Sequence, residues 1–109
     1  MYNNANDLLN DIIEAIEKIY TYTEGMNYET FLADNKTVDA VIRNFEIIGE
    51  AATKLPEEFK DTNQQINWHR IKGMRNRMAH DYRNVNISII WETIEMDLAE
   101  LKEQIKLIL

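Results

Sequence analysis

The sequence predicts an all-α protein, namely an up-down four-helix bundle with short additional helical turns. Apolar residues recur three and four positions apart along four long segments, which is the spacing of one face of a helix. The 109 residues include only three Gly and one Pro, so the chain has few residues that interrupt helices. Apolar residues make up 45% of the chain, enough for a packed core. The length fits one domain, residues 1–109.

The first long helix is expected over residues 7–23. Asn6 is its predicted N-cap, and Gly25 is the residue that ends it. A short helical turn over residues 28–33 should follow, capped by Asn27. The apolar face of the first helix consists of Leu8, Leu9, Ile12, Ile13, Ile16, Ile19 and Tyr20.

The second long helix is expected over residues 37–54. Gly49 lies inside it and costs about 1 kcal/mol relative to Ala, but a glycine can also let another helix approach closely. Pro56 should end the helix and begin a polar turn over residues 57–63, with room for one helical turn. The core stripe of this helix consists of Val38, Val41, Ile42, Phe45, Ile48, Ala52 and Leu55.

The third and fourth long helices follow this turn. The third should begin after the N-cap Asn67 and end near His80 or Tyr82, with Trp68, Ile71, Met74 and Met78 facing inward. Asn86 should cap the fourth, which is expected to run unbroken almost to the C-terminus. The broad apolar faces of the first and last helices favour a homodimer. The fourth helix carries Ile87, Ile90, Trp91, Ile94, Leu98, Leu101, Ile105 and Ile108 on its apolar face.

The composition excludes several classes of site. The absence of Cys rules out disulfides, thiolate zinc sites and cysteine nucleophiles, and it fits a cytoplasmic protein. The first ten residues do not resemble a signal peptide, and no stretch approaches the roughly 20 apolar residues that span a bilayer, so we expect no membrane association. The sequence has no glycine-rich phosphate loop, and its two His lie eleven residues apart without clustered acids, so we expect no metal ion and no other cofactor.

Charge is distributed unevenly along the chain. The net charge is −7, which by itself argues against a general nucleic-acid-binding protein. Residues 66–84 nevertheless hold five basic residues and one acid, a local charge of +4, whereas the remainder holds seven basic and eighteen acidic residues, or −11. The sequence therefore predicts an acidic body with one basic strip, although charges also cluster on solvated helix faces without any function. The basic residues of the strip are Arg70, Lys72, Arg75, Arg77 and Arg83.

The strip contains side chains that suit phosphate chemistry. Arg75 and Arg77 offer a fixed positive charge and paired donors for phosphate oxygens. His80 titrates near neutrality and can donate or accept a proton, while Asn76 could orient the histidine or the phosphate. RNA supplies its own nucleophile, the 2′-OH, so cleavage would require only a base, an acid and positive charge. Cations near a helix C-terminus are also favourable for the helix dipole alone, which is the structural alternative.

The spacing of this group raises a geometrical problem. Asn76 and His80 are four residues apart and share a helix face, whereas Arg75 and His80 are five apart, about 140° around a regular helix. Either the helix ends before His80, or Arg75 reaches around it, or the site combines residues of two subunits. One histidine per chain is also one proton-transfer group short, and a two-fold dimer would supply the second.

Arg75, His80 and Tyr82 form an Arg-x4-His-x-Tyr pattern, which resembles the signature of HepT-like toxins in the HEPN superfamily. Asn76 fits as well, because a polar residue typically follows the arginine there. Residues 36–52, the block 68–81 and the Ile90-Trp91 pair resemble further blocks of that family, so the likeness covers nearly the whole chain. Arg83 and Asn84 depart from the pattern, since many relatives have an aromatic residue and a Gly after the tyrosine.

The resemblance implies a dimeric helical bundle and a metal-independent endoribonuclease toxin, with Arg75 and His80 as the catalytic pair and Asn76 and Arg77 in support. It also implies a minimal nucleotidyltransferase antitoxin as partner. In some members that partner transfers AMP to the tyrosine of the motif, here Tyr82, which would oppose RNA access through added charge and bulk. The alternative is a non-catalytic module that binds the nucleotidyltransferase or its substrate. The acidic body of the chain favours this alternative.

Overall fold

The computed structural model describes residues 4–80 and 87–109, with the backbone alone at positions 74 and 76–80. Every regular element in these residues is a helix, so the predicted all-α class is confirmed. Four stretches are long and two are short, as expected for a bundle with additional turns. The helices are α1 (Ala5–Thr23), α2 (Tyr28–Leu32), α3 (Asn35–Lys54), α4 (Glu57–Thr62), α5 (Trp68–His80), α6 (Ile87–Met96) and α7 (Leu98–Ile108).

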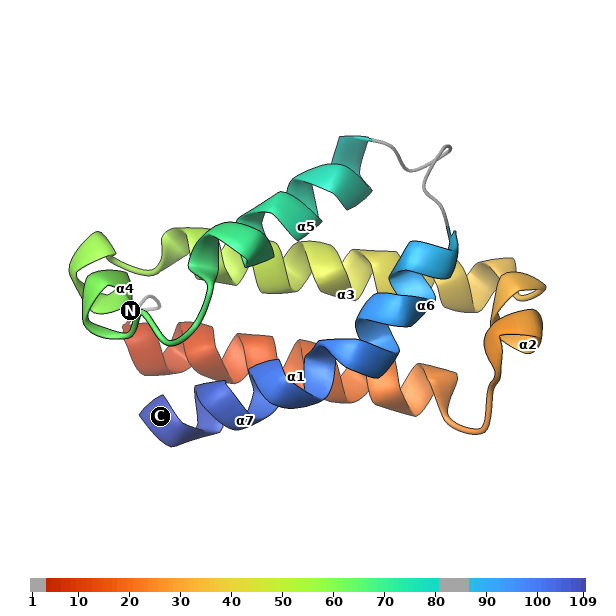
Figure 1. Ribbon diagram of the computed structural model, residues 1–109, viewed down its shortest axis with the longest axis horizontal. Helices are drawn as coiled ribbons and strands as arrows, with labels where there is room; N and C mark the ends of the chain where they lie inside the picture. The colour runs from red at the N-terminus through yellow and green to blue at the C-terminus, as the bar shows by residue number, and fades with distance from the viewer. Residues whose placement is uncertain (1–3, 81–86) are drawn as a thin grey trace.

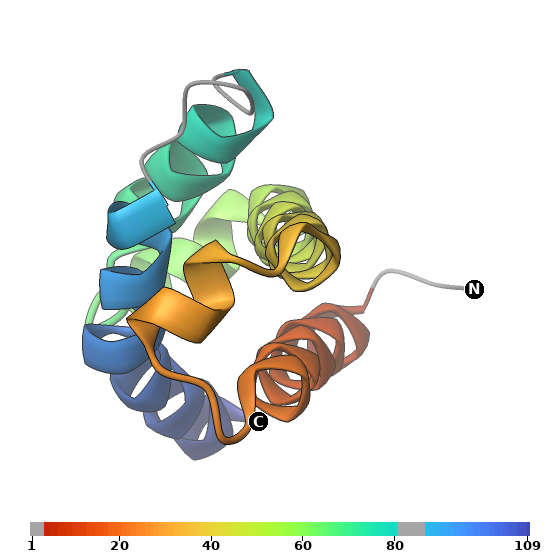
Figure 2. The ribbon, with the colours of Figure 1, turned by 90° about the vertical axis from the view of Figure 1, so that its right-hand side faces the viewer.

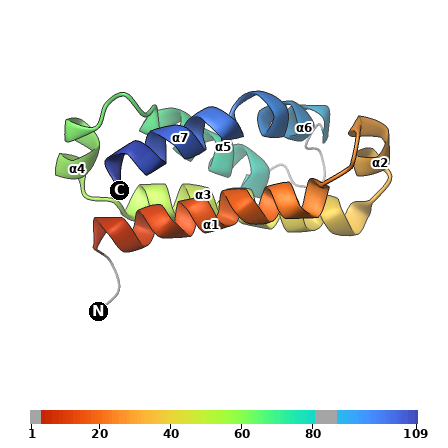
Figure 3. The ribbon, with the colours of Figure 1, turned by 90° about the horizontal axis from the view of Figure 1, so that it is seen from below.

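The helices form two layers. Helices α1 and α3 lie antiparallel and side by side in one layer, while α5, α6 and α7 form the other (Figure 1, Figure 2). The short helices α2 and α4 close opposite ends of the molecule, as Figure 3 shows. Helix α3 packs against both α1 and α5, so it connects the two layers. The helix that carries the sequence motif therefore rests on α3.

The N-cap of α1 differs from the sequence prediction. The side chain of Asn4 accepts a hydrogen bond of 2.8 Å from the backbone N–H of Asp7, so Asn4 is the cap and Asn6 lies inside the helix. Both asparagines precede the apolar stripe. With Asn4 as the cap, the helix begins two residues earlier than predicted and so gains two helical residues. At the other end Gly25 has φ of +76°, the left-handed conformation that glycine adopts without strain.

The next two N-caps are also formed by side chains. Asn27 and Thr30 exchange side-chain hydrogen bonds with each other's backbone N–H, which caps α2 as predicted. Helix α3 begins at Asn35, two residues earlier than predicted. The Asp34 carboxylate accepts hydrogen bonds from the backbone N–H and the hydroxyl of Thr37, and these bonds hold the pKa of Asp34 below its ordinary value.

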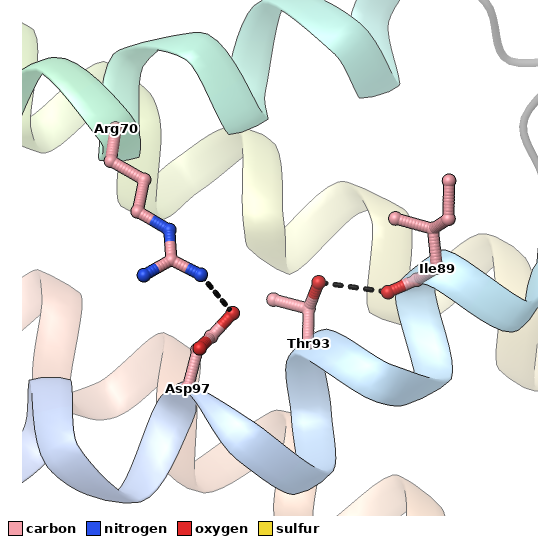
Figure 4. Close-up of polar contacts among 4 residues, drawn as sticks. All are labelled: Arg70, Ile89, Thr93 and Asp97. Carbon is pink, nitrogen blue, oxygen red and sulfur yellow. Dashed lines mark hydrogen bonds and ion pairs between the residues drawn. The ribbon is translucent and has the colours of Figure 1, made fainter.

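The fourth long helix of the prediction is interrupted. Asp97 separates α6 from α7, so the expectation of one unbroken helix was wrong. The Asp97 carboxylate accepts a 2.8 Å hydrogen bond from the Arg70 guanidinium, and the Thr93 hydroxyl donates to the carbonyl of Ile89 (Figure 4). Hydroxyl-to-carbonyl bonds of this kind often bend helices. The apolar spacing continues through Asp97, so nothing in the sequence pattern marks the break. The predicted cap, Asn86, lies outside the described residues.

The core matches the predicted stripes. All seven predicted core residues of α3 are buried, and so are five of the seven on α1, with Ile13 and Tyr20 only partly buried. Trp91 stacks on Phe31 of α2 with ring centroids 5.1 Å apart, which anchors α6 to the end of the bundle. Among the described residues, none of the helices is both long and apolar enough to cross a membrane. The described core side chains of the second layer are Ile71, Ile90, Ile94, Leu98, Leu101 and Ile105.

Candidate active site

The base of α5 is fixed by polar contacts. The side chain of Asn67 accepts a 2.9 Å hydrogen bond from the backbone N–H of Arg70, which confirms Asn67 as the N-cap. The indole N–H of Trp68 donates to the carbonyl of Asn63 at 3.1 Å, and its ring packs against Phe59 of α4. Trp68 is therefore a structural residue of the helix start, as the sequence predicts.

Helix α5 continues without interruption through His80. This removes one of the three arrangements that the sequence allows, namely a helix that ends before the histidine. At about 100° per residue, positions 75 and 80 point about 140° apart, so the motif arginine and histidine do not share a face of α5. Either the Arg75 side chain reaches around the helix, or a second chain completes the site.

Position 80 lies on the outer side of α5. It is nine residues from Ile71, about 180° around the helix, and Ile71 is buried in the core. Position 76 is four residues earlier and lies within about 40° of position 80, as predicted. The backbone thus carries the Asn76 and His80 positions on the side turned away from this chain's own core. The side chains of Asn76, Arg77 and His80, and Tyr82 altogether, lie outside the described residues.

Arg75 lies on the α3 side of α5. Its side chain is half-buried, and its first three carbons face Gly49 in the middle of α3. A methyl group built on Gly49 would overlap Arg75 Cβ and stand 2.6 Å from Cγ and 2.8 Å from Cδ. The close helix approach predicted at Gly49 is therefore present, and the side chain that uses the space is the motif arginine. Sequence analysis did not pair these residues, which lie 26 positions apart.

The described basic residues of α5 divide over two sides of the helix. Arg70 turns toward the junction of α6 and α7 and is paired with Asp97 at 2.8 Å. Lys72 is exposed and lies about 200° around the helix from Arg70, but only about 60° from Arg75. The predicted basic strip is thus not one continuous surface: Lys72 and Arg75 share a side, and Arg70 has a structural partner on the other.

An open hollow of about 580 Å³ lies at the base of α5, between α3 and α4. His69 and Lys72 line it from α5, and Lys60 lines it from α4. Acidic groups line it as well, and Lys60 is 3.3 Å from Glu57. The charges around the hollow cancel, so it is no electropositive groove. His69 is exposed and lies six residues before Arg75 on α5.

Comparisons with known proteins agree with the family that the sequence motif suggests. The family described as Ribonuclease HepT-like matches residues 12–108. A protein of Thermococcus cleftensis named "Probable ribonuclease HepT" is 41% identical over 94% of this chain and 93% of its own length. Two other relatives, each named as a "Putative RNase", come from Caldanaerobacter subterraneus and Methanocaldococcus jannaschii. They are 40% and 38% identical over 93% and 90% of this chain, and over 90% and 84% of their own lengths. No solved structure matches the chain.

Proposed function

This chain belongs to the HepT-like ribonuclease family, and we propose that it is a cytoplasmic endoribonuclease that cleaves RNA without a metal ion. The observation that carries the proposal is the family match across the whole of α5, the helix that holds Arg75 and His80 in the Arg-x4-His-x-Tyr pattern. Arg75 supports it further, because its half-buried stem packs on α3 and so gives the guanidinium a defined base.

The proposed reaction is transesterification. A base removes the proton of a 2′-OH, and the 2′-oxygen attacks the neighbouring phosphorus. An acid then protonates the departing 5′-oxygen, which leaves a 2′,3′-cyclic phosphate and a 5′-OH. His80 would serve as base or acid, since imidazole titrates near neutral pH. Arg75 and Arg77 would hold the phosphate and stabilise the charge that builds up on its oxygens, and Asn76 would orient the reacting groups.

A homodimer would resolve two difficulties at once. Positions 76 and 80 lie on the outer side of α5, about 100° and 140° from Arg75, so one chain does not present all three on one face. A two-fold axis beside this side of α5 would bring together two histidines and two sets of arginines. One histidine could then act as base and the other as acid. We therefore propose that the active site lies between two copies of the chain.

The regulation that we propose follows from the family pattern around Tyr82. The chain would be the toxin of a toxin–antitoxin pair, and its partner would be a minimal nucleotidyltransferase. In the inhibiting reaction the Tyr82 hydroxyl would attack the α-phosphorus of ATP, forming a phosphodiester to AMP and releasing pyrophosphate. The added negative charge and nucleoside beside the site would oppose the approach of RNA. Intact mass after co-expression would reveal the AMP adduct, and Tyr82→Phe should abolish it.

The rival function is a non-catalytic binding module for the same nucleotidyltransferase. The acidic remainder of the chain favours it, because most of the surface should repel RNA. Binding to the nucleotidyltransferase fits both functions and so does not separate them. Turnover on RNA does separate them, because only the enzyme would show it.

The decisive experiment is RNA cleavage in excess EDTA, with the product ends identified. Purified wild type should cut and leave cyclic phosphate and 5′-OH ends. His80→Ala should be slower by about 10²–10⁴-fold, the usual contribution of a general acid or base. His69→Ala is the matched control, because His69 is exposed and lies eleven residues, about 16 Å along α5, from His80, so this variant should cut like wild type.

Three outcomes would contradict the proposal in different ways. Products with 5′-phosphate ends would exclude transesterification to a cyclic phosphate. Loss of cutting in EDTA, with recovery on adding a divalent metal, would exclude the metal-independent mechanism. A wild type with unmodified Tyr82 that cuts no RNA would leave the binding module as the better account.

A further inference from the structure

Gly49 of α3 and Arg75 of α5 lie directly against each other. Gly49 is buried, and nonbonded carbon atoms normally stand about 3.5–4.0 Å apart. A Cβ at position 49 would overlap Arg75 Cβ and would lie 2.6 Å and 2.8 Å from the next two carbons of that side chain. No residue with a side chain fits at position 49 while Arg75 keeps its place.

The reason for glycine here is space and not backbone conformation. Gly49 lies in a regular helix, where any residue adopts the same backbone angles and where glycine costs about 1 kcal/mol relative to Ala. Gly73, the glycine of α5, provides the contrast, because a Cβ built there meets nothing within 4 Å. The chain therefore accepts a destabilising residue at position 49, at the point where the motif arginine crosses α3.

The atoms involved determine what a substitution would do. Arg75 Cβ is bonded directly to the backbone of α5, so it cannot swing aside as the end of a long side chain can. A methyl group at position 49 would fit only if α5 moved away from α3 or turned about its axis. Both movements would relocate the Arg75 guanidinium, and a displacement of about 1 Å at a catalytic group can reduce a rate about 10²-fold.

We propose that Gly49 is a positioning residue for the RNA-cleaving reaction. Because Gly49 has no side chain, the Cβ, Cγ and Cδ atoms of Arg75 can lie against the backbone of α3. This contact sets where the guanidinium meets the phosphate. Holding the stem also lowers the entropy that Arg75 loses on binding, because long side chains lose rotamer freedom when they are fixed. This inference rests on the proposed function, since it gives Gly49 a role through Arg75.

The activity test is a double-mutant cycle on RNA cleavage with Gly49→Ala, Arg75→Gly and the double variant. Gly49→Ala should lower kcat/KM about 10–10²-fold. If Gly49 acts through Arg75, the double variant should be no worse than Arg75→Gly alone, because both the guanidinium and the Cβ that opposes position 49 are already gone. Effects that multiply in the double variant would overturn the proposal, and so would a fully active Gly49→Ala.

Two control variants separate positioning from loss of stability. Gly73→Ala is the matched glycine substitution on α5, and its stability should be unchanged or slightly higher, because the added Cβ meets nothing within 4 Å. Ile71→Val trims the core side chain that lies one turn before Arg75 and should cost about 0.5–1.5 kcal/mol of stability. A loss of activity in Ile71→Val equal to that in Gly49→Ala would overturn the proposal, because disturbed packing alone would then explain both.

A stability measurement tests the contact without any activity. Urea unfolding should show that Gly49→Ala is destabilising, and that this cost largely disappears when Arg75→Gly removes the opposing Cβ. An unchanged cost in the Arg75→Gly background would mean that Arg75 does not occupy this place. If Arg75→Ala cuts RNA normally, the proposed active site fails together with the role of Gly49. If Arg75→Ala is inactive and Gly49→Ala is fully active, only the positioning role fails.

Discussion

The α1–α3 layer and helix α5 differ in how many buried apolar side chains they carry. Helices α1 and α3 carry long apolar stripes, and all seven predicted core positions of α3 are buried. Among its described side chains, α5 contributes one buried apolar residue, Ile71, and one partly buried residue, Trp68, and its other side chains are polar or charged. Among the described side chains, the α1–α3 layer therefore contributes many more buried apolar residues than α5 does.

Truncation of the first layer should give the largest effect. Phe45 is 1% exposed at the centre of α3, so Phe45→Ala should destabilise the protein by about 3–5 kcal/mol through lost burial and the cavity left behind. Urea unfolding followed by circular dichroism would measure this. Met96→Ala is the control, because Met96 is 70% exposed and its truncation should cost far less. Equal costs at the two positions would contradict the division between the layers.

A change at Arg75 should do the reverse of Phe45→Ala, lowering activity while leaving stability nearly unchanged. Arg75→Lys keeps the charge and the carbon stem against Gly49 but removes the planar fork that binds two phosphate oxygens. We expect RNA cleavage to fall about 10²-fold, the effect of losing one transition-state donor, with little change in the urea midpoint. Arg43→Lys on the exposed side of α3 should change neither. A fully active Arg75→Lys would show that positive charge alone suffices.

Lys72 should have a smaller effect, limited to binding. It is exposed and lies about 60° from Arg75 on α5, so it can contact a phosphate next to the one that is cleaved. Lys72→Ala should raise KM several-fold without lowering kcat, and it should reduce the slope of log affinity against log salt by about 1. Lys106→Ala, an exposed lysine of α7, should leave both quantities unchanged. A reduced kcat in Lys72→Ala would instead place Lys72 among the reacting groups.

The smallest effect concerns the cap of α3. Hydrogen bonds from Thr37 lower the pKa of Asp34 in the folded protein, so the ionised carboxylate favours folding. This contribution is present above the unfolded pKa, about 4, and is lost as the pH falls through the lower folded pKa. Urea unfolding between pH 2 and about 5 should show a shallower pH dependence for Asp34→Asn than for wild type. Thr37→Ala should give an intermediate slope, and identical slopes in all three proteins would contradict this account.

Local signals in the sequence were sufficient for most of the fold. Helical spacing located the long helices, and Asn27 and Asn67 were identified as caps because each precedes an apolar stripe. Asn4 was missed because Asn6 is an equally good cap by composition. The break at Asp97 was missed because the apolar spacing of the helix continues through it.

The arrangement of the candidate site depends on contacts between distant parts of the chain. The pairing of Arg70 with Asp97 joins residues 27 positions apart, and the charge of each gives no hint of its partner. Gly49 did carry a signal, since a glycine inside an amphipathic helix suggests close approach. The sequence could not say that the approaching residue is Arg75. The roles of Arg75 and His80 remain predictions from the motif.

Several side-chain contacts fix the start of α5, so a small tilt at that end would be enlarged at the far end of the helix. The Asn67 cap, the Trp68 indole and the Arg70–Asp97 pair all lie within its first turn, whereas His80 is its last residue. Ten residues of helix separate Arg70 from His80, a length of about 15 Å, so a tilt of only about 4° at the base moves the tip by about 1 Å. Substitutions near Asp97, far along the chain from the motif, should therefore change the rate of RNA cleavage while leaving every proposed reacting group in the sequence.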